Sequence, residues 1–178
     1  MSTSAFASDP TATHEPIFAV ERWSATSGSA RSSRADLVLT GAGRRWRAHT
    51  NGNGAVDALL KAVDIALGAV LGEGVELQTY NVHATGHGHD TAAAVTLSLR
   101  PRSADPHAPA YAGRGIHENI LEASLTAYVD AINRLVTHGN VDVAAAAPAP
   151  DATEVPARAD DADTSERHKE RFMEMFNH

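Results

Sequence analysis

The chain has 178 residues, of which 43% are hydrophobic and only 5% aromatic, so we expect one domain with an aliphatic, alanine-rich core and polar tails. Its formal net charge of −7 argues against broad nucleic-acid binding, and the lack of cysteine excludes disulfides, thiolate metal sites and a cysteine nucleophile. No apolar run reaches the roughly 18 residues of a membrane helix, and residues 1–13 carry no secretory signal, so we expect a cytoplasmic protein without membrane contact.

The first half of the chain predicts three strands followed by a helix. The turn signal at Gly41-Ala42-Gly43 indicates a hairpin between the second and third strands. From Gly54 onward, apolar residues recur every three or four positions, which is typical of an amphipathic helix, and Gly72 stands where such a helix should end. The expected elements are strands at 17–23, 36–40 and 44–49, a Ser- and Gly-rich loop at 24–33, and a helix at 54–71.

The second half repeats this order of elements. Strands are expected at 75–82, 92–100 and 110–112, and a helix at 117–137. The predicted fold class is therefore α+β, with two layers of sheet and helix built from duplicated βββα units in pseudo-twofold symmetry.

The composition of the chain also predicts its domain organisation. One domain should cover residues 16–140, with its first unit at 16–73 and its second at 74–140. The flanking segments are expected to be a disordered leader at 1–15, an Ala-, Pro- and Asp-rich linker at 141–163, and a short amphipathic helix at 164–178. A helix this short is marginal alone in water, so it would dock on its own domain or on a partner, or stay frayed.

A Gly-x-Gly element comes before each expected helix. Gly52-Asn53-Gly54 and Gly113-Arg114-Gly115 are 61 positions apart and each is followed by an amphipathic stretch. Uncovered backbone N–H groups at a helix start can hold an anion or a carboxylate. Glycine also permits a tight turn from strand to helix without any ligand, so both interpretations remain open.

Two polar clusters are further candidates for binding. One cluster contains His83, His87, His89 and Asp90, whose spacing could suit Zn or Ni. A solvent-exposed turn rich in polar residues explains the same spacing and is favoured. A basic stretch runs from the expected loop at 24–33 to the third strand, with Asp36 as its only acid. On a hairpin its alternate side chains would lie on opposite faces, and a solvated face is again favoured over an anion site. Its members are Arg31, Arg34, Arg44, Arg45 and Arg47.

No grouping of nucleophile, base and acid is apparent, and no strand-linked GxGxxG or P-loop motif points to a nucleotide cofactor. We therefore expect no catalytic residues and no cofactor. A binding module is favoured over an enzyme.

The chain resembles the C-terminal allosteric (dimerisation) domain of 2-isopropylmalate synthase, the first committed enzyme of leucine biosynthesis, over residues 17–138. Citramalate synthases carry similar domains. The resemblance rests on five segments: Gly52 to Leu59, Tyr80 to Ala84, Gly88 to Ala93, Gly113 to Gly115, and Ala123 to Arg134. The last segment, which reads A-S-L-T-A-Y-V-D-A-I-N-R, is the most specific of them.

This resemblance implies a fold of two βββα units, which agrees with the strand and helix pattern. It also implies a homodimer with a site for L-leucine, or a related branched-chain effector, between the units near the dimer interface. Small side chains would leave room for an isobutyl group. The effector-binding positions that it implies are Gly52, Asn53, Gly54, Asp57, Ala84, Thr91 and Ala93.

Enzymes of this family carry the domain after a catalytic TIM barrel, for which this chain has no room. We therefore expect no enzymatic activity from this chain by itself. The leading expectation is a regulatory domain that acts on a synthase partner, with residues 164–178 as a docking helix. The alternatives are an assembly domain that senses nothing, or a subunit of an acetyl-CoA-condensing acyltransferase.

Overall fold

The computed structural model describes residues 16–29, 31–86, 91–105, 108–139 and 141–146. The expected leader at 1–15 and the expected helix at 164–178 lie outside these residues. The elements are β1 (Phe18–Gly28), β2 (Arg31–Gly41), β3 (Arg44–Gly52), α1 (Ala55–Ala66), α2 (Gly68–Leu71), β4 (Val75–Ala84), β5 (Ala93–Pro101), β6 (Tyr111–His117) and α3 (Ile120–His138).

These elements confirm the predicted duplication of a βββα unit. Strands β1-β2-β3 form one antiparallel sheet and β4-β5-β6 form another, each in sequence order and each followed by a helix. The hairpin between β2 and β3 turns at Ala42 and Gly43, which both have positive φ, as a type I′ turn requires.

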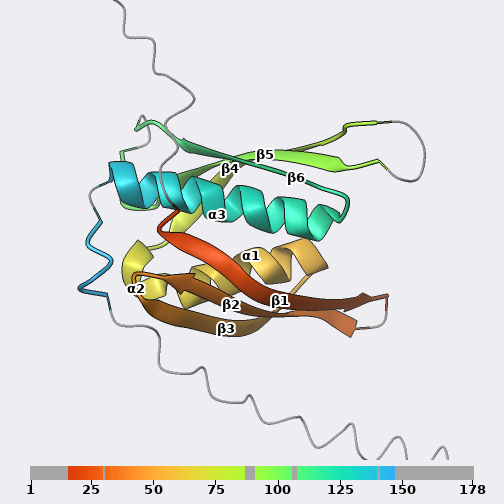
Figure 1. Ribbon diagram of the computed structural model, residues 1–178, viewed down its shortest axis with the longest axis horizontal. Coiled ribbons are helices and arrows are strands. Elements are labelled where there is room, and N and C mark those ends of the chain that lie inside the picture. The colour runs from red at the N-terminus through yellow and green to blue at the C-terminus, as the bar shows by residue number, and fades with distance from the viewer. Residues whose placement is uncertain (1–15, 30, 87–90, 106–107, 140, 147–178) are drawn as a thin grey trace, which may run out of the picture.

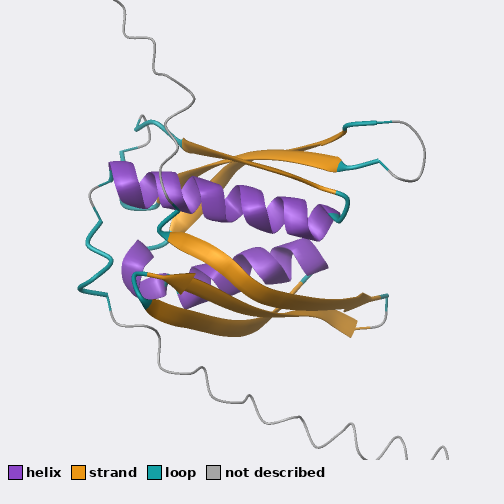
Figure 2. Ribbon diagram, in the orientation of Figure 1, coloured by secondary structure: helices purple, strands orange, loops and turns teal. Residues whose placement is uncertain are grey.

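Each unit has the two expected layers, because its helix covers one face of its own sheet. Helix α1 contacts β2 and β3, and α3 contacts β5 and β6. The two helices also contact each other, so both lie between the two sheets (Figure 1, Figure 2). None of the helices in the described part of the chain is long and apolar enough to cross a membrane.

The core lies in this central helix layer and in the sheet faces turned toward it. Alanines at every fourth position, Ala58, Ala62 and Ala66 in α1, are buried and let the helix approach its sheet closely. Trp46 on β3 is fully buried and meets the ring of Phe18 edge to face at 5.9 Å between centroids.

The prediction of a loop at 24–33 is wrong, because β1 continues to Gly28 and β2 begins at Arg31. Ser, Gly and Ala have low strand propensity, which is why this stretch looks like a loop in isolation. In the sheet, however, β2 pairs on both sides, and small residues such as Ala35 face the core. The hydroxyls of Ser27 and Ser33 also hydrogen bond across the hairpin at 2.8 Å.

The single helix expected at 54–71 is divided in the structure. Helix α1 ends at Ala66, Leu67 leaves helical geometry with φ −99° and ψ 12°, and α2 starts at Gly68. Glycine is a weak helix former, so the break falls beside it. Gly72 then ends α2 with a positive φ of 60°, in the place where the sequence predicts a helix end.

The second Gly-x-Gly does not start a helix, which corrects the interpretation of both copies as helix-start elements. Gly113 and Gly115 lie inside β6, and α3 begins only at Ile120. A Cβ on Gly115 would come within 2.1 Å of the Ala123 carbonyl oxygen, and one on Gly113 within 2.0 Å of the Ala127 carbonyl oxygen. These glycines allow α3 to lie directly on β6. From α1 to α3 the structural repeat is 65 positions, Ala55 to Ile120, and not 61.

Besides the contact between α1 and α3, hydrogen bonds between β1 and α3 join the two units. Asn133 on α3 accepts a hydrogen bond from the Phe18 backbone N–H at 2.8 Å and donates one to the Phe18 carbonyl at 2.9 Å. Nearby, the Trp23 indole N–H donates to the Glu122 carboxylate. The first strand of unit one is therefore anchored to the last helix of unit two.

Candidate functional site

The first Gly-x-Gly joins β3 to α1 and brings Asp57 against the backbone. Gly54 is the N-cap of α1, with an extended φ of −151° and no side-chain cap. The Asp57 carboxylate accepts the Asn53 backbone N–H at 2.9 Å and the Lys61 ammonium at 2.8 Å. A Cβ on Gly52 would lie 2.6 Å from this carboxylate oxygen, so the close approach needs glycine.

Asp57 is the charged group at this helix start. Its hydrogen bond to Lys61 holds its pKa below the usual range, with help from the Asn53 N–H and against the effect of burial. Asp57 is therefore ionised at neutral pH. Because a carboxylate has about four lone-pair sites, it can accept further donors, such as an ammonium group. The Asn53 N–H, by contrast, is already engaged with Asp57.

The start of α3 differs from that of α1, although both follow a third strand. Asn119 caps α3 by accepting the Leu121 N–H at 2.9 Å, and its own N–H donates to His117 Nδ1 at 2.9 Å. Helix α1 has no such side-chain cap. The first helix start is thus the more open of the two.

The remaining predicted effector residues lie in the second unit. Ala84 ends β4 and faces Ala93 at the start of β5 as a cross-strand pair, and Thr91 comes just before β5. The structure brings Ala84 and Ala93 together, whereas Gly52 to Asp57 belong to the first unit. The β4–β5 hairpin end and the start of α1 lie at the same end of the molecule (Figure 1).

The histidine cluster is mostly outside the described part of the chain. His83 is exposed on β4, and His87, His89 and Asp90 are not among the described residues. No group of three or more residues able to ligate a metal is found in the described ranges.

Sequence reasoning did not find the polar link between the two helices. The Tyr128 hydroxyl on α3 donates to the Asp64 carboxylate on α1 at 2.7 Å. Burial is the main reason that the pKa of Asp64 rises to about 6, although the bond from Tyr128 and the charge of Arg102 act in the other direction. Burial also raises the pKa of Tyr128. A carboxylate within the apolar pattern of α1, between Val63 and Leu67, was the available signal.

Comparison with known proteins assigns the family. Residues 2–136 match the model of the LeuA allosteric (dimerisation) domain. Curated 2-isopropylmalate synthases are similar over much of the chain. The one from Nitrosospira multiformis is 32% identical over 131 residues, 74% of this chain and 24% of that protein. The one from Aromatoleum aromaticum is 35% identical over 109 residues, 61% of this chain and 20% of that protein.

A third relative, the 2-isopropylmalate synthase of Xanthomonas campestris pv. campestris, is 38% identical over 94 residues, which is 53% of this chain and 16% of that protein. The chain thus spans about a quarter or less of the length of these relatives. The match covers both βββα units that the structure describes. The chain belongs to the LeuA allosteric (dimerisation) domain family.

Proposed function

We propose that this protein is a regulatory domain that dimerises, binds a branched-chain amino acid such as L-leucine, and controls a synthase carried by another chain. The observation that carries this proposal is the match of residues 2–136 to an allosteric and dimerisation domain. Its curated relatives are named 2-isopropylmalate synthase, and this relationship supports an effector from leucine biosynthesis. The same setting favours the cytoplasm.

The chemistry of the predicted effector residues supports this ligand class. Asp57 is ionised and partly exposed at the start of α1, where it suits the ammonium group of an amino acid. Ala84 and Ala93 are small and paired, which leaves room for a branched aliphatic side chain. These groups lie in different units at one end of the molecule, so an effector there would respond to how the units are arranged.

An uncovered strip of the second sheet supports dimerisation. Leu77 and Val82 on β4 face the same side of the sheet as their partners Leu99 and Val95. Leu99 and Val95 are buried, but Leu77 is 42% exposed and Val82 39%. A second copy packed on this strip would remove the exposed apolar side chains from water. Sedimentation should then give a dimer, and Leu77→Lys with Val82→Lys should shift it to monomer.

A thermal-shift measurement with leucine, isoleucine, valine and citramalate tests effector binding. At a ligand concentration tenfold above Kd, binding should raise the free energy of unfolding by about 1.4 kcal/mol. A selective rise with one branched-chain amino acid supports the proposal. If none of the four shifts the melting temperature, the sensor function is wrong and an assembly domain remains, supported by the exposed strip on β4.

Gly54→Asp and Gly54→Asn form a matched pair that tests the position of the site. A Cβ at Gly54 meets no atom within 4 Å, and its φ suits any residue. Both substitutions also supply a good N-cap, so the free energy of unfolding should stay the same or rise by about a few tenths of a kcal/mol. The charged variant should lose the leucine response by repelling the ligand carboxylate, and the neutral one should retain at least part of it. Equal responses would show that the site is elsewhere.

The acyltransferase alternative is tested by activity. The purified chain should give no condensation of acetyl-CoA with 2-oxoisovalerate. Turnover by this chain alone would make it an enzyme and overturn the regulatory proposal.

A further inference from the structure

The outward face of the first sheet is basic, although the chain carries a net charge of −7. The register places Arg22, Arg34, Arg45 and Arg47 on this outward face, together with Asp36, Val38 and His49. We call this set the basic sheet face. Arg45 pairs with Glu21 at 2.8 Å, whereas no ion pair among the described residues involves Arg22, Arg34 or Arg47. The face thus carries an excess of positive charge.

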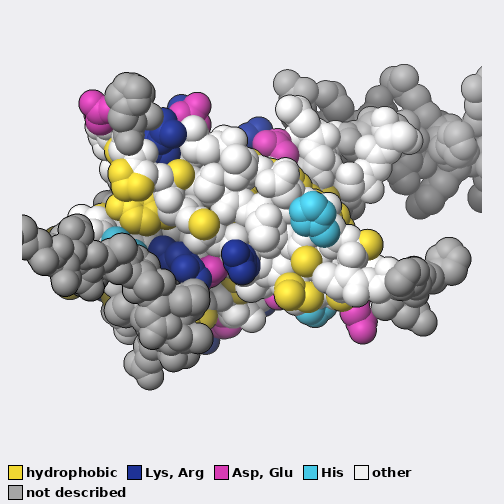
Figure 3. All heavy atoms as spheres, turned by 90° about the horizontal axis from the view of Figure 1, so that it is seen from above, with side chains coloured by type: hydrophobic (Ala, Val, Ile, Leu, Met, Phe, Trp, Pro, Cys, Tyr) yellow, Lys and Arg dark blue, Asp and Glu magenta, His cyan; other side chains and the backbone are white. Residues whose placement is uncertain are grey.

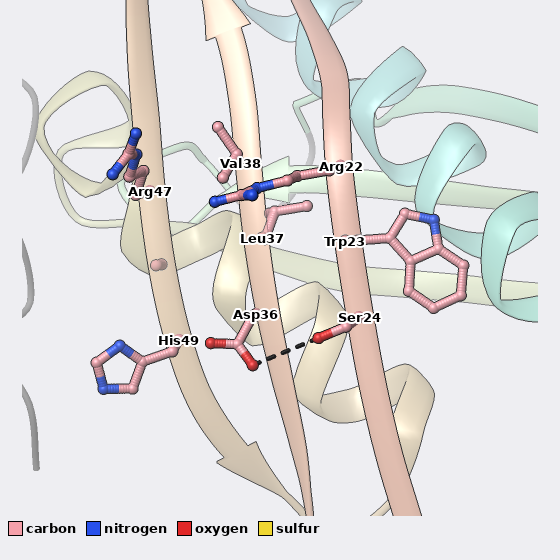
Figure 4. Close-up of a pocket in the computed structure, with 9 residues that line it drawn as sticks. Arg22, Trp23, Ser24, Asp36, Leu37, Val38, Arg47 and His49 are labelled. Carbon is pink, nitrogen blue, oxygen red and sulfur yellow. Dashed lines mark hydrogen bonds between the residues drawn. The ribbon is translucent and has the colours of Figure 1, made fainter.

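A hollow of about 430 Å³ lies on this face, between β1, β2 and β3 and away from the predicted effector residues. Arg22 and Arg47 flank Val38 as its partners on either side, and the Arg22 side chain extends across β2 (Figure 4). Val38 is only 5% exposed, because the aliphatic stems of the arginines cover it. Next to them, Asp36 accepts a hydrogen bond from Ser24 at 3.4 Å. The hollow therefore offers two guanidinium groups over an apolar floor.

The second sheet provides an internal comparison. Its outward face carries two arginines, Arg100 and Arg114, and the acid Glu76 lies opposite Arg100. Thr79 and Ser98 lie on the same face, and their hydroxyls hydrogen bond at 2.7 Å. Figure 3 views the molecule from this side, and charged side chains there are scattered rather than gathered over the strands. A basic face is therefore a property of the first sheet and not of the duplicated fold.

The chain returns to the first sheet after α3. Arg44, at the start of β3, donates to the carbonyls of Ala146 at 2.7 Å and Ala144 at 3.3 Å. Val143 and Ala146 are buried against the core. Ala146, the last residue that the structure describes, therefore lies at the end of β3 where the basic sheet face begins.

The sequence that continues from this point is acidic. Residues 151–163 contain five carboxylates and a single arginine, Arg158. The carboxylates are Asp151, Glu154, Asp160, Asp161 and Asp163. The four residues between Ala146 and Asp151 can span up to about 14 Å, and the distance along β3 from Arg45 to Arg47 is about 7 Å. The acidic segment can therefore reach the hollow.

We propose that residues 151–163 lie across the basic sheet face of the same chain, with carboxylates at Arg22 and Arg47. Such a contact is held by many weak charge pairs and by the tether, which supplies a high effective concentration. It is therefore reversible and sensitive to salt. Bound in this way, the segment shields the face from other acidic molecules.

Paramagnetic relaxation measurements test this docking directly. The chain has no cysteine, so Ala157→Cys provides one unique position for a spin label. The amide signals of Arg22, Val38 and Arg47 should lose most of their intensity at low salt. They should recover it at about 1 M NaCl, where the Debye length falls to about 3 Å.

Charge variants distinguish docking of the acidic segment by its charges from mere proximity of the segment to the sheet. Arg22→Glu with Arg47→Glu should restore the signals at low salt, and both side chains are exposed, so the sheet should remain folded. The matched control, Arg114→Glu, reverses an exposed arginine on the second sheet and should change nothing. Asp160→Asn with Asp161→Asn and Asp163→Asn repeats the test without altering the sheet.

Three results would overturn the proposal. The first is unchanged signal intensity over the basic sheet face in the spin-labelled chain. The second is a loss of intensity that persists in the charge variants. The third is a loss of signal intensity in a mixture of two chains, an isotope-labelled wild-type chain without a spin label and a spin-labelled chain without isotopes. The segment would then dock between chains.

Discussion

At the scale of single residues, Asp64 is a partly buried carboxyl group among the apolar side chains of α1. It lies between the two helices, and Tyr128 donates to it across that boundary. Burial disfavours its charged form more than the Tyr128 hydrogen bond and Arg102 favour it, so the pKa of Asp64 is raised to about 6. The contact between the two helices therefore includes a carboxyl group whose protonated form is favoured by its surroundings.

This raised pKa predicts a pH dependence of stability. An unfolded Asp has a pKa near 3.9, so the folded chain holds the proton more tightly. The stabilisation from Asp64 is complete below about pH 4 and is lost as pH rises through 6, by up to about 3 kcal/mol. Asp64→Asn keeps an acceptor for Tyr128 but does not ionise. Its free energy of unfolding relative to the wild type should therefore increase from pH 4 to pH 7.5.

Urea denaturation of both proteins at several pH values measures this difference. Other carboxylates, including Asp57, whose pKa is lowered, cancel in the comparison. Parallel stability curves for the two proteins would show that Asp64 has an ordinary pKa.

At the scale of elements, β6 and α3 fit together because glycine faces alanine. Gly113 and Gly115 meet the backbone of α3 at Ala123 and Ala127, and neither glycine has a positive φ. Their requirement for glycine is therefore one of space and not of backbone conformation.

Gly115→Ala should destabilise the protein by about 3 kcal/mol, because the new methyl group would overlap the Ala123 carbonyl and force α3 away from the sheet. Gly28→Ala is the matched control, since its Cβ would meet nothing within 4 Å, and it should change stability by less than about 0.5 kcal/mol. Chemical denaturation measures both. Equal effects of the two substitutions would contradict the close packing of α3 on β6.

The elements themselves could largely be predicted from the sequence, because hydrophobic periodicity is a local signal. The exceptions arose where the deciding partner is distant. Gly113 and Gly115 resemble a helix start locally, and only the alanines of α3 explain them as strand residues. Alanine at every fourth position, Ala123, Ala127 and Ala131, was a usable signal, since small residues on a helix often face a close neighbour.

At the scale of the whole molecule, the two units depend on each other. The pair of hydrogen bonds between Asn133 and the Phe18 backbone joins β1 to α3, and Phe18 is fully buried. Without Asn133, a buried donor and a buried acceptor would lose their partners.

Asn133→Ala should therefore lower the free energy of unfolding by about 2–3 kcal/mol and increase hydrogen exchange at the start of β1. Arg134→Ala tests the neighbouring position, where an exposed ion pair with Asp130 at 3.3 Å is lost and at most about 1 kcal/mol is expected. If Asn133→Ala lowers the free energy of unfolding no more than Arg134→Ala does, Asn133 does not anchor the two units to each other.

The proposed site was less accessible to sequence reasoning than the fold. Gly52 to Asp57 form a local motif whose geometry follows from the chain itself, and the carboxylate of Asp57 contacts the backbone of Asn53. Ala84, Thr91 and Ala93 are set by the arrangement of the second unit relative to the first, which no local pattern encodes. Their place in an effector site stays a prediction that rests on the resemblance.

The bond between Phe18 and Asn133 also bears on the order in which the protein acquires its structure. The two residues are 115 positions apart, so a chain made from its N-terminus holds β1 long before α3 exists. Closing so large a loop is entropically unfavourable and slow compared with forming hairpins. We expect residues 16–73 alone to form no cooperative unit, and folding on the ribosome to wait until α3 has emerged.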